Sequence, residues 1–472
     1  MKAFATKTEL MTHQREAVAK LLPSRVGGLF MDMGTGKTRT TIELANLRAN
    51  KIDKVVWFTP VSLKMSVAKE IRKHTDCEDI YVFDHKTNQR NLPKVRWYIV
   101  GIESIISSIR VVAAVNQLIT ERTMVVLDES SYIKGPYSKR TERLTFICSR
   151  AKYRLILTGT PLSQGVVDLY AQMRFLSEKI LGYSSFYSFA ANHLEYSEKF
   201  PGMIVRAHNT EWLATKISPY TYQVRKKDCV DLPSKVYSTK YFYMSNEQQY
   251  MYEKLKEEFL MNIDPEDWDS YLLFKLFSGL QQVVCGFYRE RRGRKREPIL
   301  HEFEHERLDI LEKLIHRIPD DEQVIIWAKY IYDIDQIRQL LEREGKTFVL
   351  YTGEQSEKER NLAEHAFHAG DAQFFVATPS SGGHGLTLNE ASTVIFYNNS
   401  FKYSERIQAE DRCHRIGQDK KVHYIDIVCA DTIDERIMSA INSKEDTLHS
   451  FQREIDAIQG DKEKIKEFIR RL

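Results

Sequence analysis

One stretch decides the fold of this chain: Phe30-Met31-Asp32-Met33-Gly34-Thr35-Gly36-Lys37-Thr38. Two closely spaced glycines precede a lysine and a threonine, and a helix-forming run follows from Arg39 to Asn50. This order is typical of a phosphate-binding loop, in which the glycines let backbone N–H groups face phosphate oxygens. The lysine then reaches the terminal phosphates, the threonine hydroxyl can ligate Mg²⁺, and the helix N-terminus adds its positive dipole end.

The loop departs from the usual pattern at one point. Glycine or alanine usually stands five positions before the second glycine, and this chain has Met31 there. The alternative interpretation is a glycine-rich turn that closes a buried strand. Residues further along the chain decide between the two.

Length and composition describe an ordinary globular protein. The chain has 472 residues, enough for two or three domains, and 42% of them are hydrophobic and 28% charged. Lys and Arg (69) only slightly outnumber Asp and Glu (65), so the net charge of +4 does not by itself indicate a nucleic-acid partner. The N-terminus has no apolar signal core and no run is long enough to span a bilayer, so we expect no membrane partner.

The cysteines indicate a reducing compartment. No two of the six have zinc-ligand spacing, and their wide separation does not suggest a disulfide framework. The expected location is therefore the cytoplasm. The six positions are Cys77, Cys148, Cys229, Cys285, Cys413 and Cys429.

Short apolar runs alternate with amphipathic helical stretches in the first half of the chain. This alternation predicts a parallel sheet with crossover helices, and the apolar run Val125-Val126-Leu127 fits a strand that is buried on both faces. The predicted strands are Val55–Thr59, Tyr98–Gly101, Met124–Asp128 and Arg154–Thr158.

The pattern changes after about Arg225 and then returns. Ser245–Tyr288 has helical spacing without a strand run, the basic run Arg289–Arg296 follows, and alternation restarts after a predicted helix near Glu306–Ile318. The tail Ile433–Leu472 is charged and helical. The second set of predicted strands is Val324–Ala328, Thr347–Tyr351, Phe374–Thr378, Thr393–Asn398 and Val422–Val428.

We therefore predict an α/β protein with two parallel-sheet units and a helical insert between them. The first unit spans residues 1–230 and contains the phosphate loop, residues 231–304 form the helical insert and a basic linker, and residues 305–472 form the second unit with its helical tail. The basic run Arg289–Arg296 either makes a salt-sensitive phosphate contact or is simply solvated.

Two acids follow the apolar run of the first unit. Asp128 and Glu129 stand at the carboxyl end of a predicted buried strand, which is where open α/β sheets bind ligands. We predict that Asp128 holds Mg²⁺, directly or through water, and that Glu129 orients and deprotonates the attacking water. A solvated acid pair is the alternative. Leu157–Pro161 also follows a strand, and is either a plain turn or a link between the phosphate site and a surface.

An arginine pair marks the second unit. Arg412 and Arg415 lie three positions apart, so on a helix they share a face. Guanidinium groups presented across a cleft to a γ-phosphate would stabilise charge in the transition state, an effect worth roughly 10³–10⁵ in rate in other NTPases. A salt-bridged surface helix is the alternative.

Taken in order, these motifs resemble the Swi/Snf-type ATPases of the superfamily-two helicases. The resemblance extends from Leu10 to Arg436, with motifs in family order and at family-like distances. The motifs that carry it are Met33–Thr38, Asp128-Glu129 with Ile133-Lys134, Leu157–Leu162, Arg225–Asp228, Leu232–Lys235, Ser381–Leu386 and Asp411–Gln418.

The resemblance implies two RecA-like lobes that hold ATP and Mg²⁺ between them. By motif match, Gln14 would contact the adenine, Gly385 would lie at the nucleotide, and Thr38 and Asp128 would hold the metal. The implied catalytic residues are Lys37, Asp128, Glu129, Arg412 and Arg415. The other implied ATP-binding residues are Met33, Gly34, Thr35, Gly36, Lys37 and Thr38. The implied nucleic-acid contacts are Thr59, Pro60, Ser62, Thr352, Thr378 and Ser381.

The chain departs from the family pattern in several places. Ser130-Ser131 replaces the more usual Ala-His after the acid pair, Thr387 replaces an Asn, and Met31 replaces an Asp. The insert is also short, and we expect no accessory domain beside the motor, as in a minimal microbial or viral form.

The function implied by the resemblance is that of an ATP hydrolase, stimulated by nucleic acid, that moves along duplex DNA without reading its sequence. It would act on the nucleoid or on other intracellular DNA. Three alternatives remain open. One is a strand-separating helicase, which needs a wedge or hairpin where this chain is predicted to be helical. The others are a non-catalytic nucleic-acid scaffold and a remodeller whose target is a bound protein.

A pair of histidines invites a metal interpretation. His301 and His305 lie four positions apart, which would place both on one face of a helix, but no third ligand is evident. We predict a solvent-exposed pair without a metal.

Overall fold

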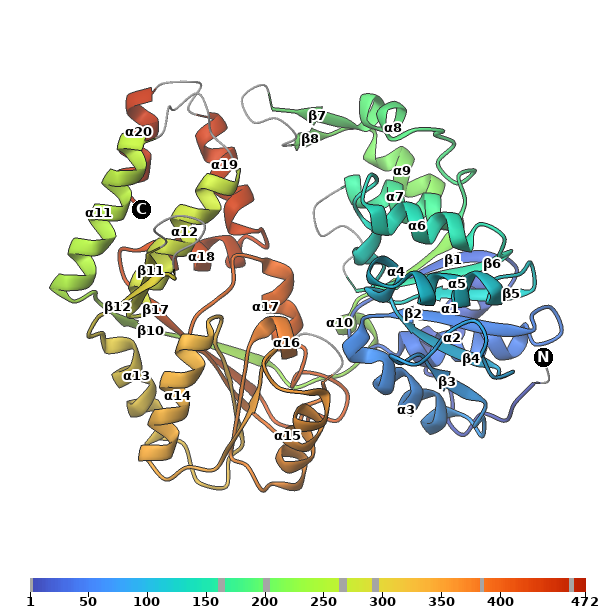
Figure 1. Cartoon of the computed structure of the whole chain (residues 1–472), viewed down its shortest axis with the longest axis horizontal. Helices are drawn as coiled ribbons and strands as arrows, with labels where there is room; N and C mark the ends of the chain where they lie inside the picture. Colours follow the sequence, from blue (N-terminus) through green and yellow to red (C-terminus); the bar gives the residue numbers. More distant parts are fainter. Residues whose placement is uncertain are drawn as a thin grey trace. The chain divides into compact units, whose positions relative to one another are not determined.

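Residues Met1–Glu195 and Ile204–Asp231 belong to one unit of the protein, and Leu232–Leu472 belong to a second. The computed structural model describes residues 3–159, 166–197, 204–262, 270–290, 297–382, 386–457 and 462–472. Each unit has a central sheet with helices packed against it (Figure 1). All six cysteines are free thiols. In the described ranges, no helix is both long and apolar enough to cross a membrane.

The first unit is built on a seven-stranded sheet in which all neighbouring strands are parallel. The strand order is β3-β4-β2-β5-β6-β1-β9, so β1 and β5 both lie next to β6. The strands are β1 (Val26–Met31), β2 (Lys54–Thr59), β3 (Ile80–Val82), β4 (Trp97–Gly101), β5 (Thr123–Leu127), β6 (Tyr153–Thr158) and β9 (Thr221–Val224).

Both faces of this sheet are buried, because alternate residues of a strand point to opposite sides. In β5, Met124 and Val126 enter one hydrophobic cluster, whereas Val125 and Leu127 enter another. The first cluster receives buried residues from α1 (Thr12–Leu21), α2 (Lys37–Leu47) and α3 (Lys64–His74). This two-sided burial explains the near-continuous apolar sequence of the strand.

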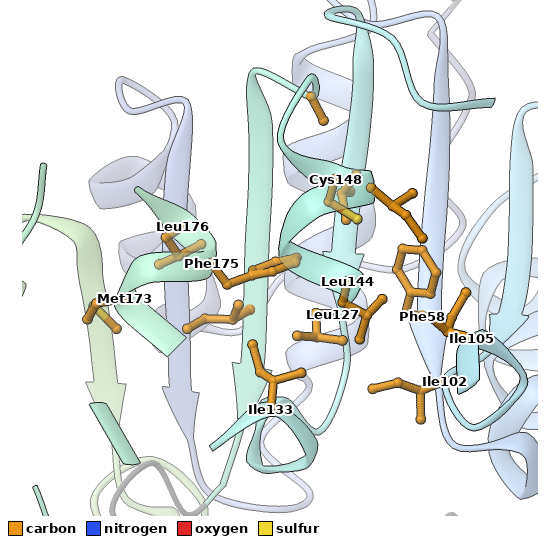
Figure 2. Packing of buried hydrophobic residues seen from close by; sticks show 14 of the residues in the cluster. Phe58, Ile102, Ile105, Leu127, Ile133, Leu144, Cys148, Met173, Phe175 and Leu176 are labelled. Carbon is orange, nitrogen blue, oxygen red and sulfur yellow. The ribbon is translucent and has the colours of Figure 1, made fainter. Parts of the chain in front are cut away.

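The second cluster lies on the opposite face of the sheet (Figure 2). There Phe58 and Leu127 of the strands share a core with Ile133, Leu144 and Phe175. The helical elements that contribute buried residues are α4 (Ser104–Ser107), α5 (Ile109–Leu118), η2 (Ser130–Ile133), α6 (Lys139–Cys148), α7 (Val167–Leu176), α8 (Phe186–His193) and α9 (Thr210–Ile217). The remaining elements before the second unit are η1 (Val61–Leu63), η3 (Ser218–Tyr220), α10 (Lys226–Cys229) and a two-stranded sheet of β7 (Leu194–Tyr196) and β8 (Ile204–Ala207).

The second unit has a six-stranded sheet, again with every neighbouring pair parallel. The strand order is β10-β17-β16-β13-β15-β14. The strands are β10 (Lys235–Phe242), β13 (Val324–Trp327), β14 (Phe348–Tyr351), β15 (Phe374–Ala377), β16 (Thr393–Phe396) and β17 (Val422–Cys429). Together the two sheets confirm the predicted α/β fold class.

Helices cover both faces of the second sheet as well. Val324 and Ile326 of β13 face a large cluster, and Ile325 and Trp327 face a smaller one. The large cluster draws buried residues from α11 (Asn246–Asn262), α12 (Ser270–Val284), α13 (Glu306–Ile315), α14 (Ile331–Arg343), α18 (Ile433–Asn442), α19 (Thr447–Ala457) and α20 (Lys462–Arg470). The smaller one draws them from α15 (Glu357–Ala369) and α17 (Tyr403–Glu410), and the short α16 is Pro379–Gly382.

The region predicted to be a helical insert and linker contains strands as well. β10 pairs along its whole length with β17, so residues 235–242 belong to the second sheet. Helix α12 ends at Val284 because Gly286 takes a φ of +87°, where a Cβ atom would lie 2.0 Å from the His305 ring. An antiparallel hairpin of β11 (Phe287–Glu290) and β12 (Ile299–Glu302) follows. α11 and α12 confirm the helical prediction for most of Ser245–Tyr288, whereas the prediction is wrong for Phe287 and Tyr288, which belong to β11.

One buried ion pair ties the second unit together. The fully buried Arg307 guanidinium bonds to the Asp434 carboxylate and donates to the carbonyls of Tyr397 and Ile427. It thereby joins α13, α18 and the ends of two central strands. A charge in this position needs its partner, because an unpaired buried charge has no water to solvate it.

We expect Asp434→Ala to lower the free energy of unfolding of the second unit by about 3–5 kcal/mol, because it leaves Arg307 charged and unpaired. Chemical denaturation of the full chain measures the change. Asp320→Ala, which breaks an ion pair between the exposed Asp320 and Lys346, is the matched control and should cost less than about 1 kcal/mol. Equal midpoints for the two variants would contradict the role given to Arg307.

Candidate nucleotide site

The carboxyl edge of the first sheet brings the sequence motifs of that unit together. β1 leads into the loop that ends at Lys37, β5 leads into Asp128, and β6, between them, leads into Gly159. Because the strands are parallel, all three segments leave the sheet at the same edge. The expected phosphate loop and acid pair therefore occupy one side of the unit.

The loop has the backbone that its glycines predict. Gly34 and Gly36 have φ values of +78° and +83°, in the left-handed region that favours glycine. At Gly36 a Cβ atom would lie 2.1 Å from Nε2 of Gln14, so no other residue fits without a shift. Helix α2 begins immediately afterwards, at Lys37.

Two side chains in the first turn of α1 bond to one backbone carbonyl of the glycine loop. The His13 ring, through Nε2, and the Gln14 side-chain amide both bond to the Thr35 carbonyl, at 2.8 and 3.1 Å. The other end of the Gln14 amide accepts a bond from the Met11 N–H at 3.0 Å. In a planar trans peptide the N–H points away from the carbonyl, so this contact turns the Gly36 N–H away from α1. Sequence reasoning found Gln14 but missed His13, which has no motif of its own.

Lys37 extends back across the mouth of β1. Its ammonium donates to the carbonyls of Met31 and Asp32, at 2.9 and 3.3 Å. It is also close enough to Asp128 to lower the pKa of that carboxyl. The positive charge therefore lies between the loop and the acid pair.

Asp128 is half-buried at the end of β5. Burial raises its pKa above the usual value, and the positive charge of Lys37 and bonds from neighbouring groups oppose the shift only in part. Its Oδ2 accepts from the Trp57 indole and the Thr59 hydroxyl, each at 3.4 Å, and its Oδ1 accepts from the Glu129 N–H at 3.1 Å. Trp57 also gave no functional signal in the sequence, because it reads as an ordinary core residue of β2.

The backbone of Glu129 has a left-handed conformation that residues with a side chain rarely adopt. Its φ and ψ are 49° and 61°, and its side chain is largely buried. The 3-10 turn η2 starts directly after it. A strained residue at the carboxyl edge of a sheet is typical of a functional position.

These groups fit a magnesium nucleotide. Mg²⁺ prefers oxygen ligands, and the carboxylate of Asp128 and the hydroxyl of the half-buried Thr38 offer them at the same sheet edge as the lysine. Backbone N–H groups at the start of α2 suit phosphate oxygens. The donor set therefore suits the phosphates and the metal ion of a nucleoside triphosphate.

A further family motif lies beside the loop. The Asp32 carboxylate accepts a bond from the Lys226 N–H at 2.8 Å, and the Asp32 N–H donates to the Val224 carbonyl at 3.1 Å. These bonds fix the start of α10 against the phosphate loop. The stretch Arg225–Asp228, distant in sequence, is thus part of the same edge.

The expected nucleic-acid residues differ in accessibility. Ser62 is exposed and Ser381 half-buried, whereas the side chains of Thr59, Thr352 and Thr378 are at most 4% exposed. Thr59 donates to Asp128 and Thr378 donates to the Ser381 hydroxyl at 2.8 Å. Pro60 is also buried. Of these side chains, Ser62 is the one most open to a ligand.

In the second unit the arginine pair converges on one backbone carbonyl. Arg412 and Arg415 both donate to the carbonyl of Leu386, at 3.3 and 3.0 Å, and Arg415 also donates to the Thr387 hydroxyl at 2.7 Å. The structure thus brings the closing motif against the segment that follows Gly385. Gly385 itself, like Thr160, Pro161 and Arg291–Arg296, lies outside the described residues.

The prediction that the two arginines share a helix face is wrong. α17 ends at Glu410, and the chain then turns. Beyond that end, the Arg412 carbonyl accepts a bond from the Leu388 N–H at 2.8 Å. The pair meets through this turn rather than through helical spacing.

The histidine pair is neither helical nor exposed. His301 lies on β12, where it stacks on Tyr288 and bonds to Glu290 at 3.0 Å. His305 is half-buried just before α13, and burial lowers its pKa to about 4, with Arg307 adding to the shift. The prediction of a solvent-exposed pair is therefore wrong, and His305 is uncharged at neutral pH.

Comparison with family models shows to which family the chain belongs. Residues 12–286 match the family model described as SNF2-related domain, and residues 306–417 match that of the helicase conserved C-terminal domain. The chain belongs to the SNF2-related family. The first match covers more than half of the chain and includes the phosphate loop and the acid pair, and the second reaches Gly417, beyond both arginines.

Relatives of this SNF2-related chain occur in bacteria and eukaryotes. It is 25% identical over 455 residues to an uncharacterized ATP-dependent helicase of Mycoplasma genitalium, covering 93% of this chain and 42% of that protein. It is 23% identical over 465 residues to the transcription regulatory protein SNF2 of Saccharomyces cerevisiae, covering 91% and 27%. It is 24% identical over 481 residues to the ATP-dependent DNA helicase DDM1 of Arabidopsis thaliana, covering 93% and 61%. The SNF2-related chain therefore spans less than two thirds of these relatives.

A solved structure also resembles the SNF2-related chain. It is the Sulfolobus solfataricus SWI2/SNF2 ATPase core in complex with dsDNA, with 21% sequence identity and a TM-score of 0.44 over 100% of this chain and 98% of that one.

We expect Asp128→Asn to raise the melting temperature of the ligand-free protein at pH 7.5. Burial raises the folded-state pKa of Asp128, so this group favours the folded state when protonated, and that stability is lost as the pH rises through the folded-state pKa. Asparagine keeps the shape without the charge, so its advantage should shrink as the pH falls toward about 4, near the ordinary aspartate pKa.

Melting curves over this pH range test the expectation. Glu9→Gln, which neutralises an exposed carboxylate of the same unit, is the control and should change the melting temperature little. An Asp128→Asn protein that melts below the parent at pH 7.5 would contradict this expectation, because it would show that neighbouring groups fully compensate the Asp128 charge.

Proposed function

We propose that this chain is an ATP-dependent translocase or remodeller that couples ATP hydrolysis to movement along duplex DNA. The observation that carries the proposal is the edge of the first sheet, where a left-handed glycine loop, Lys37 and the Asp128–Glu129 pair lie together. Membership of the SNF2-related family and the ATP-dependent activities named for its relatives support the same assignment.

The proposed chemistry divides among residues of the first unit. Lys37 and the N–H groups of the loop would bind the β- and γ-phosphates, and Gln14 would be released from Thr35 to contact the adenine. Thr38 and Asp128 would hold Mg²⁺, which when bound would neutralise charge on the phosphate oxygens. Glu129 would orient the attacking water and accept its proton. Phosphoryl transfer needs little more than such positioning and charge stabilisation.

The second unit would supply two guanidinium groups. Their common contact with the Leu386 carbonyl keeps Arg412 and Arg415 together, despite their like charge. Paired arginines suit a phosphoryl group whose charge spreads over three oxygens in the transition state. We assign them that role.

Duplex DNA is the proposed partner, and a rigid basic loop supports it. The loop between β3 and β4 carries the exposed residues Lys86, Arg90 and Lys94, and none of them forms an ion pair with another described residue. The loop is ordered by Asp84, whose carboxylate accepts from the Lys86 and Thr87 N–H groups, each at 2.9 Å. Unpaired cations on a fixed frame suit phosphates, which they bind without reading sequence.

This loop begins beside the expected nucleic-acid contacts. The Lys64 ammonium, at the start of α3, donates to the Phe83 carbonyl at 2.6 Å. Ser62 lies in the turn just before Lys64. We propose that Ser62 and the three cations form one phosphate-binding track.

Strand separation is the second candidate, favoured by the hairpin of β11 and β12. A helicase needs such an element as a wedge, and the sequence did not predict one. Phe287 at its base is buried and stacks on Tyr332 with ring centroids 4.3 Å apart, so the hairpin is anchored in its own unit. An assay that unwinds forks, compared with one that displaces a third strand from a triplex, separates this function from translocation.

We expect ATP hydrolysis by the full chain to be stimulated more by duplex DNA than by single strands, forks, RNA or no nucleic acid. Lys37→Ala should abolish turnover and leave the melting temperature close to that of the parent, because it removes a phosphate ligand from a half-buried site. Parent-like hydrolysis by the variant would refute the assignment of the loop. A parent without nucleic-acid stimulation would instead favour a scaffold.

We also expect the triple variant Lys86→Ala, Arg90→Ala, Lys94→Ala to bind duplex DNA with a weaker salt dependence. The slope of log K against log salt concentration should lose roughly 0.9 for each phosphate contact removed. A control with the same loss of charge replaces the exposed Lys20, Lys51 and Lys179 by alanine. Equal slopes for the two variants would exclude the loop from the track.

A further inference from the structure

A buried hydrogen bond connects the turn after the acid pair to α7, a helix that carries none of the sequence motifs. The Ser130 hydroxyl donates to Oε1 of Gln172, on α7, at 2.5 Å, and both residues are fully buried. Ser130 directly follows Asp128 and Glu129, whereas Gln172 is 42 positions further along the chain. Alanine, more usual at the position of Ser130 in the family that this chain resembles, has no hydroxyl and could not form this bond.

The Gln172 amide is oriented before it meets Ser130. Its Nε2 donates to the Asp168 carbonyl at 2.9 Å, one turn earlier on α7. That bond determines which end is the oxygen, so Oε1 faces Ser130 as an acceptor. An acceptor held in one orientation by its own helix restrains the hydroxyl that bonds to it.

α7 is itself firmly packed. Met173, Phe175 and Leu176 are fully buried and join the cluster that contains Leu127 and Ile133, the residues that flank the acid turn (Figure 2). The helix therefore gives Gln172 a fixed position relative to the end of β5. A side chain on such a helix can hold a neighbouring loop more tightly than one on a loop.

The backbone between the two anchors is strained. Glu129 has a φ of 49°, which a residue with a side chain holds only when its surroundings impose it. On one side the Asp128 N–H donates to the Phe58 carbonyl at 2.8 Å. On the other side Ser130 is held by Gln172. Releasing Ser130 would let the turn relax and move the Glu129 carboxylate.

We infer that Ser130 and Gln172 are positioning residues that hold Glu129 where it can orient the attacking water. The inference rests on the proposed function, in which Glu129 is the water-activating acid. Neither residue touches the nucleotide in this assignment. Their effect should therefore appear in the rate of hydrolysis and not in nucleotide affinity.

A cycle of three variants tests this in the full chain. Ser130→Ala removes the hydroxyl that donates to the Gln172 oxygen, and Gln172→Leu removes the acceptor of the Ser130 hydroxyl, so each should lower the melting temperature. The double variant removes both polar groups and should recover most of that loss. All three should lower single-turnover ATP hydrolysis about tenfold, with the dissociation constant for ATP changed less than twofold.

The double variant decides between positioning and mere stability. If it regains the parent's melting temperature but not its rate, the bond positions Glu129; if it regains both, the bond is only structural and the inference falls. Thr123→Val is the control, because it removes a buried hydroxyl bond of 2.8 Å to the Leu118 carbonyl at the opposite end of β5. It should lower the melting temperature without slowing hydrolysis.

The same experiment separates this inference from the proposed function. A parent chain that hydrolyses no ATP would overturn the proposed function and the role of Glu129 with it. A parent that hydrolyses ATP, with single variants that melt earlier but match its rate, would overturn only the positioning role.

Discussion

A carboxylate that is half-buried at the end of a strand sets the conditions for the rest of the first unit. Asp128 loses hydration on folding, which raises its pKa, and the Lys37 charge only partly offsets this. The lysine can lie there only because the glycine loop brings α2 back over the end of β1. The neighbouring strand β2 adds Trp57 and Thr59 as donors to the same carboxylate oxygen. The unit thus keeps a carboxylate in a place that disfavours its charged form.

Two left-handed backbone segments flank this charge, and a helix restrains each. The left-handed glycines of the phosphate loop are held through the Thr35 carbonyl by His13 and Gln14 of α1. The left-handed Glu129 is held through Ser130 by Gln172 of α7. The helices lie on opposite faces of the sheet, because α1 belongs to one hydrophobic cluster and α7 to the other. Packing in both hydrophobic clusters therefore stabilises one conformation of the carboxyl edge of the sheet.

How much of this was predictable depends on the range of the interaction. The central strands, such as β5 and β13, were predicted because burial on both faces gives a continuous apolar run. The edge strand β10 was missed because it mixes Lys, Tyr, Ser and Thr, and its partner β17 is far away in sequence. Loop glycines and acids have local signatures, whereas the contacts of Gln172 and His13 arise only when the chain folds. No spacing rule could have paired either with its partner.

The contacts of the arginines in the second unit could not be predicted from the sequence either, and there too a backbone carbonyl holds two side chains together. Their sequence spacing suggested a common helix face, but the helix ends first and a backbone carbonyl brings them together. In the first unit two side chains of α1 share the Thr35 carbonyl, and in the second two guanidinium groups share that of Leu386. Each unit therefore uses one backbone carbonyl to gather two side chains, and in both cases the contact is set by the fold and not by the spacing of the residues in the sequence.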